Sequence, residues 1–125
     1  STWASRPNED NTVIVEHRTY TLKALHTGDF LKLYERAALP LQLKYLGHLI
    51  GFYVSEIGPL NEVVHLWGFA SLAERERRRA LMEADPGWAV YRQALQELDV
   101  VVEQSTKILR TTAFSPTIDF DQQTA

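Results

Sequence analysis

The 125-residue sequence predicts a single α+β domain, and three observations support this fold class. Runs rich in β-branched and aromatic residues, which are typical of strands, alternate with runs in which apolar residues recur every three or four positions, as on one face of a helix. Near the middle of the chain, two strand-like runs are separated only by the turn residues GPLN. The length suits one hydrophobic core and is too short for two.

The first half of the chain predicts a strand followed by a helix. The strand is expected over 13–22, VIVEHRTYTL, and it ends near the turn KALHTGD. Either Thr27 or Asp29 is placed to cap the helix that follows, and Pro40 is expected to kink this helix or divide it in two. Gly47 is expected to end it. Its apolar stripe consists of Phe30, Leu33, Tyr34, Ala37 and Leu41.

The two central runs, 48–57 and 62–70, predict an antiparallel hairpin with GPLN at its tip. The first of them is apolar at nearly every position, so we expect it to be buried on both faces. An odd-length loop would exchange the two faces of the hairpin. With Pro59 and Leu60 at the tip, the expected cross-strand pairs are Val54 with His65, Phe52 with Trp67, and Glu56 with Val63.

The second half of the chain predicts two helices and a last strand. Ser71 and Glu74 form a capping-box pattern at the start of SLAERERRRALMEA. Asp85 followed by Pro86 is typical of a second helix start, over PGWAVYRQALQEL. The last strand is expected over 100–114.

The resulting order, βαββαβ, is the ferredoxin-like plan of one antiparallel sheet with helices on one face. We expect this domain to occupy 13–116, between a flexible N-terminal leader over 1–12 and a C-terminal tail over 117–125. Helices of one chain cover only one face of such a sheet, whereas the central hairpin is apolar on both faces. The sequence therefore predicts a homodimer, packed sheet to sheet as an α/β barrel, with a small-molecule pocket between the two sheets.

Composition excludes several classes of function. A hydrophobic fraction of 45% and a formal net charge of −3 indicate a globular protein without the basic excess that nucleic acid binding requires. No apolar run approaches the roughly 20 residues of a membrane span. The absence of cysteine excludes disulfides and thiolate metal sites. We therefore expect no nucleic acid partner, no membrane span and a cytoplasmic location.

The chain resembles the NIPSNAP family in four segments: EHRTYTLK at 16–23, LGHLIGFYVSEIGPLNEVVHLWGFASLAERERRR at 46–79, DPGW at 85–88 and FSP at 114–116. The resemblance implies the dimeric α/β-barrel superfamily, whose members include cofactor-independent monooxygenases, muconolactone-type isomerases and haem-binding enzymes. It implies a fold more specifically than a reaction, because bacterial NIPSNAP domains mostly lack an assigned one and mitochondrial ones are described as interaction proteins. His17 departs from the family, which usually has an aliphatic residue there.

The first and third strands are central neighbours in this plan, so their polar residues are expected to meet. Glu16 and Arg18 would then stand beside His65, an arrangement able to shift the pKa of the imidazole. The catalytic hypothesis makes His65 a general base and Arg18 a clamp for an anionic ligand. Tyr20, Phe52 and Trp67 are expected to form the walls around a flat substrate, and Glu56, on the same face, is a further candidate for binding it.

Three functions remain open at this point. The first is a cofactor-independent oxygenase, isomerase or lyase that uses the residues above. The second is a non-catalytic dimeric scaffold or partner-binding protein, in which Glu16 and Arg18 form a structural ion pair and His65 is a core histidine. The third is a ligand carrier or sensor.

Cofactor and metal signals are weak. None of the four histidines forms an HxxxH or HExxH pattern, so we expect no metal, and the predicted helices carry no histidine placed to ligate haem. Glycine-rich phosphate loops are absent, so no nucleotide cofactor is expected. The run ERERRR at 74–79 alternates charges at helical spacing and predicts a solvated helix face.

Overall fold

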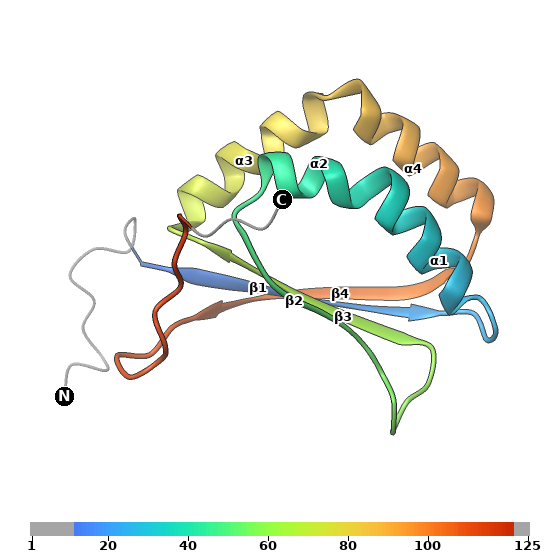
Figure 1. The fold of residues 1–125 in the computed structure, drawn as a ribbon, viewed down its shortest axis with the longest axis horizontal. Helices are drawn as coiled ribbons and strands as arrows, with labels where there is room; N and C mark the ends of the chain where they lie inside the picture. Colours follow the sequence, from blue (N-terminus) through green and yellow to red (C-terminus); the bar gives the residue numbers. More distant parts are fainter. Residues whose placement is uncertain (1–11, 122–125) are drawn as a thin grey trace.

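The computed structural model describes residues 12–121, which form a four-stranded antiparallel sheet with its helices on one face (Figure 1). This confirms the α+β, ferredoxin-like prediction. Most of the expected 1–12 leader, and the end of the tail at 122–125, lie outside the described residues. In chain order the elements are β1 (Ile14–Leu22), α1 (Thr27–Leu33), the π-helical segment η2 (Tyr34–Ala38), α2 (Leu39–Tyr45), β2 (His48–Val54), β3 (Glu62–Phe69), α3 (Leu72–Ala84), α4 (Pro86–Leu98) and β4 (Val101–Arg110).

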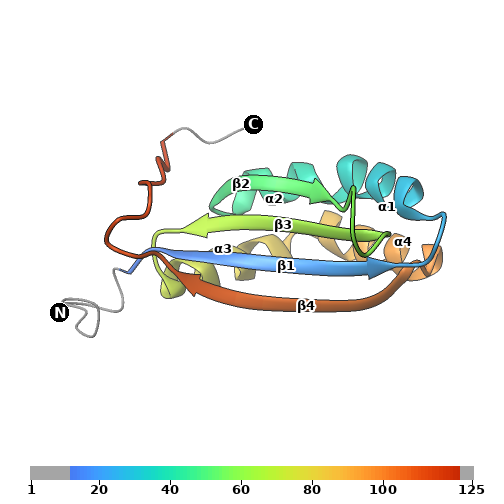
Figure 2. The ribbon, with the colours of Figure 1, turned by 90° about the horizontal axis from the view of Figure 1, so that it is seen from below.

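The strand order is β2-β3-β1-β4, so β1 and β3 are the central neighbours, as predicted. Viewed from below, the four strands lie in front of the helices and their open face carries no helix (Figure 2). His17 of β1 pairs with Leu66 of β3 and with Lys107 of β4. Its neighbour Glu16 faces the helices, so by alternation along the strand the side chain of His17 lies on the open face. Two core clusters fill the space between the other face and the helices.

The first helical stretch is continuous but changes its winding before Pro40. The N–H of Leu39, the residue before Pro40, donates to the Tyr34 carbonyl. This π-type hydrogen bond closes η2. Because Pro40 has no N–H, the regular α-helical pattern cannot run through this position unchanged. The predicted interruption is thus confirmed, whereas the predicted caps are wrong: the helix begins at Thr27 after His26, without a side-chain cap.

Gly47 lies two residues after the end of α2 at Tyr45, and its backbone passes close to the backbone of Gly68 in β3. A Cβ at this position would lie 2.0 Å from the carbonyl oxygen of Gly68. Only glycine lets the two backbones approach in this way, which explains the residue better than a helix stop alone.

The predicted hairpin forms, but its register differs by two residues. Val54 pairs with Val63 and Phe52 pairs with His65, with an irregularity between Leu49 and Gly51. The turn is longer than GPLN, because the Ser55 N–H donates to the Glu62 carbonyl at the base of a loop containing Gly58 at φ 113°. Faces are preserved, since a two-residue shift keeps the alternation in phase.

Two further predictions about β2 are wrong. This strand lies at the edge of the sheet, and Ile50, Tyr53 and Val54 are exposed rather than buried on both faces. Glu56 falls in the exposed loop, so it does not pair with Val63 or join the site. Continuous apolarity did not distinguish an edge strand from a central one.

The caps of the second half are confirmed. The Glu74 N–H donates to Ser71 Oγ at 3.1 Å, and the Gly87 N–H donates to Asp85 Oδ1 at 2.8 Å. β4 ends at Arg110, four residues before the predicted limit. The segment that follows returns to the open face, where a Cβ at Gly68 would meet Ile118 Cδ1 at 2.9 Å.

Candidate functional site

The predicted constellation forms, but on the face of the sheet that the helices cover. Cross-strand pairing joins Glu16 with Trp67 and Arg18 with His65. Tyr34 of η2 lies edge-on to the His65 ring, with 5.7 Å between ring centroids. The expectation that these residues face a pocket between two sheets is therefore wrong. Both faces of β3 are apolar in sequence, so the pattern could not show which face the helices would cover.

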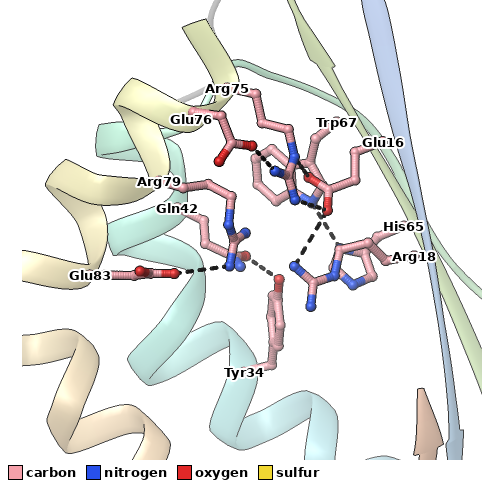
Figure 3. Close-up of polar contacts among 10 residues, drawn as sticks. All are labelled: Glu16, Arg18, Tyr34, Gln42, His65, Trp67, Arg75, Glu76, Arg79 and Glu83. Atoms are coloured by element: carbon pink, nitrogen blue, oxygen red, sulfur yellow. Dashed lines mark hydrogen bonds and ion pairs between the residues drawn. The ribbon is translucent and has the colours of Figure 1, made fainter. Parts of the chain in front are cut away.

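A polar cavity of about 160 Å³ lies between the sheet and the helices. Of the predicted site residues, Arg18 and Tyr20 line it, whereas Glu16, His65 and Trp67 do not. Figure 3 shows how side chains from β1, β3, the first helical stretch and α3 converge in this region. The full lining consists of Arg18, Tyr20, Tyr34, Gln42, Arg79, Trp88, Tyr91, Arg92, Leu95 and Gln104.

Glu16 holds a buried ion-pair network beside this cavity. Its side chain is 1% exposed and accepts two hydrogen bonds from Arg75 of α3, from Nε at 3.1 Å and from Nη2 at 3.0 Å. Arg18 Nη1 lies 3.7 Å from Glu16 Oε2, at longer range (Figure 3). Two guanidinium groups thus share one carboxylate, and the more direct, bidentate partner is Arg75.

Two arginines present unsatisfied donors in this region. Within residues 12–121, Arg18 Nε and Arg79 Nη1 are buried and have no hydrogen-bond partner. Arg79 Nη2 reaches Glu83 at 3.4 Å, a long contact at the outer side of α3. Buried guanidinium donors are normally paired, so these two atoms mark a place where an anionic group would be stabilised.

His65 is fully buried and its ring orientation is set by two contacts. Its Nδ1 accepts a 2.8 Å hydrogen bond from the indole N–H of Trp67, and its ring stacks on Phe52 with centroids 4.5 Å apart. Burial, together with the charge of Arg18, lowers the pKa of His65 to about 3. The imidazole is therefore neutral at physiological pH. Because Nδ1 is an acceptor, the proton is on Nε2, which has no partner among the described residues.

Tyrosines supply the remaining polar surface. The Tyr34 hydroxyl donates a short hydrogen bond to Gln42 Oε1 (Figure 3). Burial raises the pKa of Tyr34 well above its usual value, and burial likewise raises the pKa of Tyr91. Both phenols are neutral, so the charges lining the cavity are the positive ones of Arg18, Arg79 and Arg92.

A second, apolar cavity of about 330 Å³ lies at the side of β2. Phe52, predicted as a wall of the substrate pocket, lines this cavity rather than the polar one. Tyr34 lines both. The apolar cavity is lined by Leu31, Lys32, Tyr34, Glu35, Leu39, Leu49 and Phe52.

Sequence reasoning missed Arg75 and Arg79, because it assigned the run 74–79 to solvent. That holds for Arg77, which is 57% exposed and pairs with Glu74, whereas Arg78 also donates to the carbonyls of Tyr45 and Leu46. Arg75 and Arg79, however, precede the fully buried Met82 by seven and three residues, and so lie on the buried face of α3. Helical spacing back from Met82 was the signal that could have identified them.

Residues 12–121 contain no group of three or more histidine or acidic side chains arranged to hold a metal ion. None of their helices has the length and apolarity needed to cross a membrane. The expected absence of a metal and of a cofactor stays a prediction.

Comparison with known proteins agrees with this architecture. The NIPSNAP family profile matches residues 15–116. Protein NipSnap homolog 3B of Mus musculus is 30% identical over 89 residues, which are 70% of this chain and 35% of that protein. The match therefore spans about a third of the length of this relative.

Solved structures extend the likeness to the whole domain. An uncharacterized NIPSNAP-like domain protein from Burkholderia xenovorans is 41% identical, with a TM-score of 0.79, and the match covers 87% of this chain and 93% of that one. A NIPSNAP family protein of unknown function from Agrobacterium tumefaciens is 38% identical, with a TM-score of 0.77 and coverage of 86% and 96%. A putative antibiotic biosynthesis monooxygenase from Nitrosomonas europaea, 12% identical with a TM-score of 0.61 and coverage of 85% and 96%, shares the fold alone. On the profile match over most of its length and the likeness to these solved relatives, the chain belongs to the NIPSNAP family.

Proposed function

We propose that this protein binds a small organic anion whose anionic group enters the polar cavity of each protomer, where Arg18 and Arg79 hold it. The observation that carries the proposal is the pair of buried, unpartnered guanidinium atoms, Arg18 Nε and Arg79 Nη1, on residues that line the cavity. Glu16 does not satisfy Arg18 Nε, because the contact between the two residues is a 3.7 Å ion pair through Arg18 Nη1.

His65 has a different role in this proposal from the general base expected from sequence. A pKa of about 3 makes the imidazole a weak proton acceptor at neutral pH. We assign it a structural role: it holds Trp67 and Phe52 in place and keeps a neutral N–H in the wall behind the cavity. Binding is therefore proposed ahead of catalysis. Turnover of the ligand by an oxygenase, isomerase or lyase reaction rests on family resemblance alone.

We also propose that the protein is a homodimer packed through the open sheet face. Helices cover only the other face (Figure 2). Apolar side chains on the open face include Ile50 and Leu109, which are 40% and 39% exposed. A second copy of the same face would remove these side chains from water. In this arrangement each protomer keeps its own cavity on the far side of its sheet.

Direct binding measurements test the anion site. Isothermal titration calorimetry with benzoate and hexanoate as probes should detect binding to the unaltered protein. Arg18→Met should weaken it at least tenfold, since a charge-assisted hydrogen bond contributes roughly 1.5–3 kcal/mol. Arg36→Met, which removes an exposed arginine on η2, is the matched control and should leave the affinity unchanged. Equal affinity in the Arg18 variant and the control would overturn the assignment.

A further inference from the structure

Tyr34 lines both cavities described above. On one side Tyr34 lines the polar cavity together with Arg18, and on the other it lines the apolar cavity together with Phe52. The Tyr34 ring lies 4.8 Å from the Phe52 ring and 6.0 Å from the Tyr91 ring, between centroids. Tyr34 is thus the one residue shared by the linings of the cationic and the apolar cavity.

The polar cavity is too small to hold a whole organic ligand. Ligand sites usually enclose roughly 300–1,000 Å³, whereas this cavity encloses about 160 Å³. That volume corresponds to about five water-sized groups, at roughly 30 Å³ each. It suits the carboxylate end of a molecule and little more. The apolar cavity, at about 330 Å³, has the size and lining of a site for a hydrocarbon body.

Tyr34 occupies a position at which the backbone departs from α-helical winding. It is the first residue of η2, and π-helical turns occur often at functional sites. Its hydroxyl is tied to Gln42, which also lines the polar cavity. A carboxylate entering beside Gln42 would compete for this hydroxyl, since a phenol donates to a carboxylate more strongly than to an amide.

We propose that the ligand is an amphipathic carboxylate, with its charged end at Arg18 and Arg79 and its apolar body in the cavity lined by Leu31 and Leu49, and that Tyr34 turns aside to join the two compartments. This inference rests on the proposed function, because it adds an apolar site to the anion site. Lys32 and Glu35, which are exposed, mark the outer side of the apolar cavity. If the ligand occupies both compartments, its affinity depends on the length of its hydrocarbon chain.

The test is calorimetry with a series of straight-chain carboxylates: acetate, butanoate, hexanoate and octanoate. Affinity should rise about fourfold for each methylene group that becomes buried, the factor expected for roughly 0.8 kcal/mol. Leu31→Trp fills the apolar cavity and should abolish this gain while leaving acetate binding unchanged. Leu49→Phe is a second variant that narrows the same cavity if the first does not fold. Leu81→Trp, at an exposed position of α3, is the matched control and should keep the full gain.

The outcomes separate this inference from the function on which it rests. If affinity depends on Arg18 but does not change with chain length, the anion site stands and the apolar compartment is refuted. If neither chain length nor Arg18→Met changes the affinity, both proposals fail. A chain-length gain that persists in Arg18→Met would place the ligand in the apolar cavity alone, and would overturn the joint site.

Discussion

The indole N–H of Trp67 donates a 2.8 Å hydrogen bond to Nδ1 of His65, two residues earlier on the same face of β3. This bond decides the chemistry of the imidazole. A nitrogen that accepts a hydrogen bond carries no proton, so the proton of the neutral ring is on Nε2. His65 is therefore a neutral hydrogen-bond donor through Nε2, and its Nδ1 is not free to act as a base.

The tautomer can be observed directly. In long-range ¹H–¹⁵N NMR spectra, His65 should show a protonated Nε2 and an unprotonated Nδ1, unchanged between pH 5 and pH 8. The reason is that burial and Arg18 lower its pKa to about 3. An exposed histidine, His26, provides the comparison within the same sample. A titration of His65 near pH 6.5 would contradict the assignment.

The same pKa shift makes stability depend on pH. In the unfolded chain the imidazole takes up a proton below pH 6.5, whereas in the folded protein it stays neutral until about pH 3. The unfolded state binds more protons in this window, so the stability that is present above pH 6.5 is lost as the pH falls toward 3. The free energy of unfolding should fall by about 1.4 kcal/mol per pH unit at most.

Urea denaturation between pH 6.5 and pH 4.5 measures this effect. His65→Asn keeps an acceptor for the Trp67 N–H and does not titrate, so its free energy of unfolding should fall less over the same interval. His26→Asn removes an exposed histidine and should keep the dependence of the unaltered protein. Identical pH profiles for His65→Asn and the unaltered protein would exclude His65 as the source.

The Glu16–Arg75 pair predicts a large asymmetry between single and double substitutions. Arg75→Met leaves a carboxylate that is 1% exposed with only the 3.7 Å contact to Arg18, and it should lower the free energy of unfolding by about 3–5 kcal/mol. Replacing both residues by Met removes the buried carboxylate as well and should restore part of this stability, since Arg18 then loses its 3.7 Å ion pair with Glu16. Denaturant titration of the three proteins gives the comparison.

An exposed ion pair supplies the control for this experiment. Lys23 and Asp99 lie 3.0 Å apart with both side chains in contact with solvent. Lys23→Met should change the free energy of unfolding by less than about 1 kcal/mol. If Arg75→Met lowers the free energy of unfolding no more than Lys23→Met does, the buried Glu16 network stabilises the fold no more than an exposed ion pair.

If the protein is a dimer packed through the open face, a charged side chain introduced there should convert it to a monomer. In sedimentation equilibrium the unaltered protein should have about twice the 14.3 kDa mass of one chain. Leu66→Glu places a charge at the centre of the open face, beside His17, and should produce a monomer with an unchanged circular dichroism spectrum. Leu81→Glu, at an exposed site on α3, should remain dimeric. A monomeric unaltered protein would refute the sheet-to-sheet arrangement.

Local patterns in the sequence were enough for the element order and for several contacts. Ser71 and Asp85 could be identified as caps because a cap depends on a few neighbouring residues. The meeting of Arg18 with His65 followed from the βαββαβ order, which makes β1 and β3 neighbours. The two-residue shift of the hairpin could not be predicted, because the loop from Ser55 to Asn61 is longer than its turn signal.

The fold class, the family resemblance and the meeting of the polar residues on the central strands could all be predicted from the residues alone, because alternation along a strand and strand order are local and topological properties. The face of the sheet that the helices cover could not be predicted in this way. Val63 and Val64 are equally apolar, and the choice between their faces is made by packing against helices distant in the chain. That packing placed His65 and Arg18 on the helix-covered face, beside Tyr34 of η2, where burial lowers the pKa of the imidazole and leaves guanidinium donors unpaired.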